Sequence, residues 1–105
     1  MPSGVVFQNL LTIDTDNDTG ATPVGKVRTS TIDACNDGLS DAVIKVYVST
    51  SASGTRSKLV EPNYLMPANG GGYIRTFIVG PGERIIIRPS TADVIARVSC
   101  FEEDQ

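Results

Sequence analysis

With 105 residues and a formal net charge of −3, the chain has the size of one ordinary domain and lacks the concentrated basic surface that nucleic-acid binding needs. Its composition, 40% hydrophobic and 20% charged residues, is typical of a globular protein. No apolar run approaches the roughly 18 residues of a membrane span, and the first four residues lack the features of a signal peptide. We therefore expect one domain over residues 1–105, made in the cytoplasm without export, that binds neither nucleic acid nor membrane.

The first half of the chain predicts three strands separated by polar segments. Val5–Thr12 is apolar with poor helical spacing, which predicts a first strand or an N-terminal arm within residues 1–12. Asp14–Pro23 combines Asp, Thr, Gly and Pro without apolar periodicity and predicts an exposed loop. Lys26–Ala34 alternates β-branched and polar residues and predicts a strand that ends at an Asn-Asp-Gly break. Ala42–Ser49 has the clearest alternation and predicts a strand with one face in the core.

The middle of the chain is rich in breaking residues. Thr50–Ser57 is small and polar and predicts a second exposed loop. Lys58–Glu61 predicts a short strand that ends before Pro62, because proline cannot donate to a strand ladder. An apolar Tyr64–Met66 patch follows, and then Asn69–Gly72, which predicts a flexible loop.

Tyr73–Glu103 holds three β-branched segments divided by two compact turns, which predicts a β-meander. The expected strands are Tyr73–Val79, Arg84–Arg88 and Val94–Phe101, with turns at Gly80-Pro81-Gly82 and Pro89-Ser90-Thr91. Together with the earlier segments, these strands predict an all-β fold, an antiparallel β-sandwich or jelly roll of about seven to eight short strands. A flattened small barrel is the alternative.

Three acids at alternate positions, Asp14, Asp16 and Asp18, resemble the start of a calcium-binding loop. The glycine and the closing glutamate of such a loop are missing, because Thr19 follows the third acid, and Lys26 and Val27 flank the region where the closing acid should lie. A solvated, turn-forming acidic loop is therefore the preferred interpretation, and an ion site would require a ligand from another strand or subunit.

Residues that would support catalysis are scarce. The chain contains no histidine, which removes the usual serine or cysteine hydrolase sets. Cys35 and Cys100 lack the spacing of a zinc site, so two buried reduced thiols are favoured over a disulfide between strands. The glycine-rich segments at 70–72 and 80–82 lack the sequence of a phosphate-binding loop and are interpreted as turns. We expect a protein that is not an enzyme and has no cofactor or metal.

Four arginines fall within the predicted meander and suggest a cationic ladder on the outer face of a sheet. The structural alternative is cross-strand pairing with acids of this chain or of a neighbouring subunit, and anion binding is the functional one. The arginines are Arg75, Arg84, Arg88 and Arg97, and the acids considered as partners are Glu83 and Glu102.

Several short runs of strand and turn residues lie between roughly residues 42 and 103. The runs are Val46–Thr50, Leu65–Gly71, Thr76–Arg84, Ala92–Val94, Arg97-Val98 and Phe101–Glu103. Together they resemble small virion structural proteins of tailed bacteriophages. In those proteins a strand like VYVST is commonly combined with an LPANG-type loop, a GPGE turn and a final aromatic residue followed by acids.

This resemblance implies a non-enzymatic part of a phage particle, made in the host cytoplasm and located in the virion. The expected role is a capsid decoration or cement protein that forms a homo-oligomer and contacts the major capsid protein or other virion subunits. The alternative is a tail, neck or baseplate component, including a receptor- or glycan-binding module. An apolar N-terminal arm would anchor on a neighbour, and the candidate interaction residues are Val5, Val6, Phe7, Leu10 and Leu11.

Overall fold

The computed structural model describes residues 4–105, so Met1–Ser3 of the predicted N-terminal segment lie outside the described residues. Within the described part, none of the helical segments is long and apolar enough to cross a membrane. The elements are β1 (Gly4–Leu10), β2 (Asn17–Ala21), β3 (Lys26–Asn36), β4 (Ala42–Ser49), the short 3₁₀ helix η1 (Arg56–Lys58), β5 (Leu59–Met66), β6 (Gly71–Val79), β7 (Arg84–Pro89) and β8 (Val94–Asp104).

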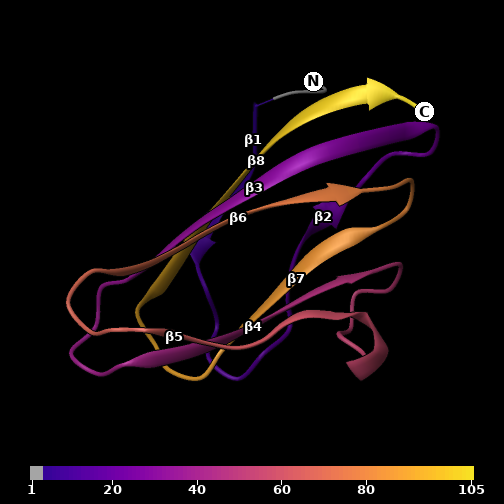
Figure 1. Ribbon diagram of the computed structural model, residues 1–105. Coiled ribbons are helices and arrows are strands. Elements are labelled where there is room, and N and C mark those ends of the chain that lie inside the picture. The colour runs from indigo at the N-terminus through magenta and orange to yellow at the C-terminus, as the bar shows by residue number, and fades with distance from the viewer. Residues whose placement is uncertain (1–3) are drawn as a thin grey trace.

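Two four-stranded antiparallel sheets form a sandwich (Figure 1). The first sheet has the strand order β1-β8-β3-β6, and the second has the order β2-β7-β4-β5. Only β4 and β5 are consecutive strands of one sheet, and the other connections between β1 and β8 cross from sheet to sheet. This connectivity is that of a jelly roll, so the predicted antiparallel sandwich or jelly roll is confirmed over a flattened barrel.

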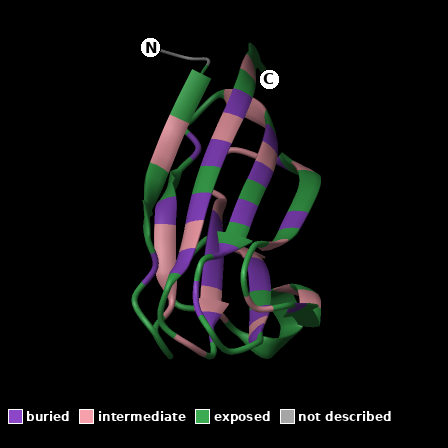
Figure 2. Cartoon of the chain, turned by 90° about the vertical axis from the view of Figure 1, so that its left-hand side faces the viewer, coloured by how far each residue is buried: buried purple, intermediate pink, exposed green. Residues whose placement is uncertain are grey.

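The core lies between the two sheets and follows the period-two alternation of the strands. Buried and exposed bands alternate along the strands in Figure 2, as expected when one face of each sheet packs inward. The core cluster consists of Leu11, Ile32, Ala34, Ala42, Ile44, Val46, Met66, Tyr73, Val79, Ile85, Ile87, Val94, Ala96 and Val98.

The predicted meander is wrong, although its three strands lie where they were expected. β6 and β8 belong to the first sheet, where β3 separates them, and β7 belongs to the second sheet. Gly80-Pro81-Gly82 therefore carries the chain across the sandwich instead of closing a hairpin. β3 pairs with β6 through nine residue pairs and with β8 through eleven. β6 and β8 thus pair with β3, which is distant in the sequence, and not with β7, which lies between them in the sequence.

The predicted exposed loop Asp14–Pro23 is also wrong, because it contains the edge strand β2. β2 pairs with β7, and its Thr19 is 5% exposed. The Thr19 hydroxyl donates a hydrogen bond of 2.8 Å to the backbone oxygen of Ile85. A polar segment can thus form a strand where a neighbouring strand supplies the backbone partners and a buried hydroxyl finds its own acceptor.

The predicted end of the strand Lys58–Glu61 is also wrong. β5 does not end before Pro62 but runs through it to Met66. This is possible because β5 is the edge of the second sheet and its register against β4 shifts twice, between Ile44 and Val46 and between Val46 and Tyr47.

Candidate functional site

Part of the outer surface of the second sheet is covered by the chain itself. Tyr47 of β4 and Ile86 of β7 are paired on this surface, yet Tyr47 is 9% exposed and Ile86 is fully buried. Gly54 of the β4–β5 connection lies against the tyrosine ring, where an added Cβ would be 2.6 Å from Cδ1. The Gly54 N–H also donates to Asp16 Oδ2 at 2.9 Å. The connection is thus a cover over the sheet, held by a close approach that only glycine permits.

Two ion pairs from β7 complete this covered surface. Arg84 Nη1 contacts Asp18 Oδ2, and Arg88 Nη1 lies 3.4 Å from Asp16 Oδ1. All four side chains are partly exposed, between 24% and 41%. Asp16 and Asp18 therefore serve as partners of arginines on β7 and stabilise the edge strand β2.

The other two arginines of the predicted ladder point elsewhere. Arg75 Nη1 donates to Glu61 Oε1 at 2.9 Å across the side of the sandwich, from β6 to β5. Arg97 lies opposite Asp33 in the β3–β8 register. The ladder is wrong because the strands that carry the four arginines are distributed over both sheets. Opposite-charge pairing, the structural alternative, describes Arg75, Arg84 and Arg88.

The acids that were considered as partners have other roles. Glu102 Oε1 accepts from Arg28 Nε at 2.9 Å, and both side chains are largely buried. Glu83 Oε1 accepts the Gly80 N–H at 2.7 Å and closes the tight turn before β7.

Asp14 stands apart from Asp16 and Asp18, the other two acids at alternate positions. It has a positive φ of 51° in the connection before β2, and its backbone N–H donates to the Pro89 carbonyl at 2.9 Å. Within residues 4–105, no group of three or more His, Cys, Asp or Glu side chains is placed to hold a metal ion.

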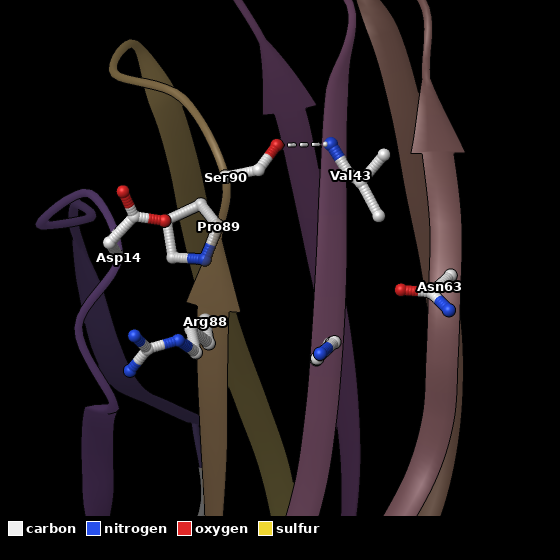
Figure 3. Close-up of a pocket in the computed structure, with 7 residues that line it drawn as sticks. Asp14, Val43, Asn63, Arg88, Pro89 and Ser90 are labelled. Atoms are coloured by element: carbon white, nitrogen blue, oxygen red, sulfur yellow. Dashed lines mark hydrogen bonds between the residues drawn. The ribbon is translucent and has the colours of Figure 1, made fainter.

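A depression of about 250 Å³ lies beside these residues on the second sheet (Figure 3). The Ser90 hydroxyl accepts the Val43 N–H at 2.9 Å and joins the two strands at its border. The lining combines both charges with amide and hydroxyl groups: Asp14, Val43, Lys45, Asn63, Arg88, Pro89 and Ser90.

The outer surface of the first sheet differs sharply, because no segment of the described chain covers its large apolar residues. We call it the open face. Ile78 of β6, Thr29 of β3 and Phe101 of β8 form one row across the sheet, and Ile78 and Phe101 are 75% and 60% exposed. Two rows away, Ile74 is 71% exposed beside Asp33. The row between them is uncharged, and Thr31 and Thr76 share a hydrogen bond of 3.0 Å within it.

The five predicted N-terminal interaction residues divide between this face and the interior. Val5 and Leu10 are 44% and 56% exposed on the open face, opposite Ser99 and Ile95. Val6 and Phe7 pack against the core, and Leu11 is 3% exposed within it. Residues 4–10 form β1, an edge strand paired with β8. The segment is thus a first strand in the structure, with two of its five apolar residues on the open face.

Sequence reasoning missed Ile74, Ile78 and Phe101 as surface residues. The available signal was the pattern of β6, in which both alternating sets contain large apolar residues: Tyr73, Phe77 and Val79 on one side, Ile74 and Ile78 on the other. A strand of a sandwich needs only one apolar face for the core, so the second apolar set indicated a second contact surface.

The two cysteines lie on neighbouring strands but on opposite faces of the first sheet. Cys35 of β3 is exposed on the open face, whereas Cys100 of β8 is 8% exposed and faces inward. No disulfide joins them. The predicted burial is therefore right for Cys100 and wrong for Cys35, because the alternation of β3 places odd-numbered residues outward.

Perturbed titrating groups occur at the margins of the sandwich. Burial raises the pKa of Tyr73 to about 12, and the charge of nearby Glu61 adds to this effect. A hydrogen bond and charge attraction from Asp104 raise the pKa of Lys26, and the same contact lowers the pKa of Asp104. These pairs join β6 to β5 and β3 to β8, which makes them structural contacts between strands.

Comparison of the chain with models of protein families, with curated proteins and with solved structures found no match.

Proposed function

We propose that this chain is a structural protein of a tailed-phage virion that decorates and stabilises the capsid exterior. The observation that carries the proposal is the open face, where Ile74, Ile78 and Phe101 are each at least 60% exposed. Large exposed apolar side chains on one sheet face, here separated by uncharged threonines, are suited to burial against a protein partner. The resemblance of the strand and turn runs to phage virion proteins supplies the biological setting.

The energetics of the open face suit a protein bound in many copies. Complete burial of an isoleucine or phenylalanine side chain contributes about 1.5–3 kcal/mol, and the three residues are 60–75% exposed, so their burial would supply roughly 3–6 kcal/mol before the costs of association. Such a contact is weak for a single copy. It becomes stable where a repeating lattice and contacts between copies act together.

The proposal assigns no catalytic residue, cofactor or metal to the chain. The major capsid protein or another virion subunit would contact the open face. The covered second sheet would face away from the particle, because its outer apolar residues Tyr47 and Ile86 are already buried by the cover.

Quantitative mass spectrometry of purified particles tests the proposal. A decoration protein should be present at on the order of hundreds of copies per particle, following the symmetry of the shell. Particles that lack the protein should lose infectivity at a lower temperature than complete particles. Detection of the protein only in the cytoplasm of infected cells would contradict the proposal.

A second candidate is a tail, neck or baseplate component that binds a receptor or glycan. The depression lined by Asp14, Lys45, Asn63, Arg88 and Ser90 favours it, because convergent carboxylate, amide and hydroxyl groups can hydrogen-bond sugar hydroxyls. A glycan array with the assembled protein distinguishes the two. Binding that is lost in Asn63→Ala would support the receptor role, as would a copy number of about a few dozen or fewer per particle.

A further inference from the structure

The edge strand β6 is unusual among the four sheet edges of the described chain. Edge strands present unpaired backbone groups, and proteins usually protect them by short length, bulges, proline or charge. β1 has a register shift between Val5 and Phe7. β2 has five residues and a shift between Asp18 and Ala21, and β5 contains Pro62 and two shifts.

β6 has none of these interruptions. It pairs with β3 over nine consecutive residues without a shift, and no strand among residues 4–105 pairs with its other side. Its one charged residue, Arg75, belongs to the inward-facing set and is engaged by Glu61 of β5. The outward set, Ile74, Thr76 and Ile78, is uncharged and exposed. β6 is therefore a long and regular edge whose single charge is already paired with Glu61, and it is suited to receive another strand.

We propose that β6 pairs antiparallel with β6 of a second copy of this chain, about a two-fold axis that passes through the Thr76 pair. In this register Ile74 of each copy lies opposite Ile78 of the other. Arg75 lies opposite Phe77 on the inward side. The two four-stranded sheets become one eight-stranded sheet, and the open faces of both copies lie on the same side of it.

The sequence of β6 selects this register over its neighbours. Residues that lie directly opposite each other in an antiparallel pair have their side chains on the same face of the sheet. Because the faces alternate along β6, the two-fold axis must pass through a pair of identical residues and not between two residues. An axis at Arg75 would place two guanidinium groups opposite each other, and an axis at Phe77 would place Ile78 opposite Thr76. The axis at Thr76 alone among these three gives two Ile–Ile pairs and no like-charge pair.

The contact between Arg75 and Phe77 fits the same register. Within one chain the Arg75 Cζ atom lies 5.5 Å from the centre of the Phe77 ring. In the dimer, Phe77 of the second copy would lie directly opposite each Arg75 and give it a second aromatic ring to contact. The charge of Arg75 is balanced by Glu61 of its own chain. This pairing does not depend on the decoration role, because it concerns the edge of the sheet and not the partner of its face.

Charge substitution at the axis tests the proposal. Light scattering should show a dimer for the unmodified chain and monomers for Thr76→Lys and for Thr76→Glu. Each substitution places like charges opposite each other, which should raise the dimer dissociation constant about tenfold or more. An equimolar mixture of the two variants should form a one-to-one heterodimer in native mass spectrometry, since the introduced lysine and glutamate then face each other.

Thr29→Lys is the matched control, because it adds the same charge to the same face on the inner strand β3. It should remain dimeric. Formation of the heterodimer shows that both Thr76 variants are folded. The proposal is overturned if the unmodified chain is a monomer, if Thr76→Lys dimerises as tightly as the unmodified chain, or if the mixture fails to associate.

Discussion

Tyr47 and Ile86 are paired directly across β4 and β7 on the outer surface of the second sheet, and both are buried there. Their burial depends on the connection that contains Gly54, whose backbone lies against the tyrosine ring. The sandwich therefore closes one of its two outer surfaces and leaves the other open. This asymmetry underlies the proposed orientation of the protein on a particle.

Gly54→Ala should lift the cover from the second sheet. The new methyl group would lie 2.6 Å from Tyr47 Cδ1, so either the ring or the connection must move. We expect a loss of about 1–3 kcal/mol in the free energy of unfolding, as for other overpacked sites. Urea denaturation measures it. Ala52→Ser, an exposed change in the same connection, should leave the stability unchanged, and equal stability of both variants would contradict the role of Gly54.

Glu102→Gln should destabilise the protein much more than Asp104→Asn, although both acids lie on β8 and pair with β3. Arg28 and Glu102 are 12% and 6% exposed, so removal of the carboxylate charge leaves the guanidinium largely buried without its counter-charge. We expect a loss of about 2 kcal/mol. Asp104 is 86% exposed, and an ion pair as open to solvent as its contact with Lys26 contributes little. Chemical denaturation of both variants at one salt concentration gives the comparison.

The stability of the protein should fall between pH 10 and pH 12 because of Tyr73. Its folded pKa of about 12 lies above the ordinary value of 10, so the folded state holds the phenolic proton over an interval in which the unfolded chain releases it. The contribution is complete below pH 10 and is lost as the pH rises through the folded pKa. We expect it to be about 2–3 kcal/mol, since a difference of one pKa unit between the two states corresponds to about 1.4 kcal/mol.

Tyr73→Phe provides the control, since it keeps the buried ring and removes the titrating group. The free energy of unfolding of this variant, measured at several pH values, should fall less steeply above pH 10 than that of the unmodified chain. Identical slopes would exclude Tyr73 as the source of the pH dependence.

Asn36→Asp should be among the most damaging single changes. Asn36 is fully buried, and its amide donates to the carbonyls of Ser40 at 2.8 Å and Met66 at 3.1 Å. A carboxylate of the same shape cannot donate and would face two carbonyl oxygens without water. We expect a loss of about 3 kcal/mol or more. Asp33→Asn, an exposed change on the same strand, serves as the comparison in thermal unfolding, and similar melting temperatures would contradict this account.

Local sequence patterns located most strands but did not determine their partners. Ala42–Ser49 has the predicted bounds because its alternation is strong and both turns are marked. The pairing of β6, β7 and β8 was mispredicted because a tight turn can join two paired strands of a hairpin or two strands in opposite sheets of a jelly roll. The turn sequence does not distinguish the two. In this fold, β3 pairs with β6 through nine residue pairs and with β8 through eleven. Such pairing between segments far apart in the sequence cannot be recognised from a local sequence pattern.

The surface residues were less predictable than the strands. Asp14–Pro23 has loop composition, and its strand β2 exists only because β7 offers a backbone edge and Ile85 an acceptor for Thr19. The apolar N-terminal segment indicated an interaction surface, but three of its apolar residues, Val6, Phe7 and Leu11, pack in or against the core. The exposure of Phe101 could not be predicted from the sequence, since the face on which it lies depends on the register between β8 and β3.

The occupancy of purified particles by a Phe101→Glu variant tests the central claim most directly. Phe101 lies on the open face but not on an edge strand, so the change addresses the face without altering the β6 edge. Particles that lack the protein are mixed with each variant, and bound copies are counted by quantitative mass spectrometry. Leu39→Glu is the control, because Leu39 is 90% exposed in the connection between β3 and β4. Our account predicts that Phe101→Glu binds about tenfold more weakly or worse, whereas Leu39→Glu binds like the unmodified protein. Equal binding of both variants, or no binding of the unmodified protein, would contradict it.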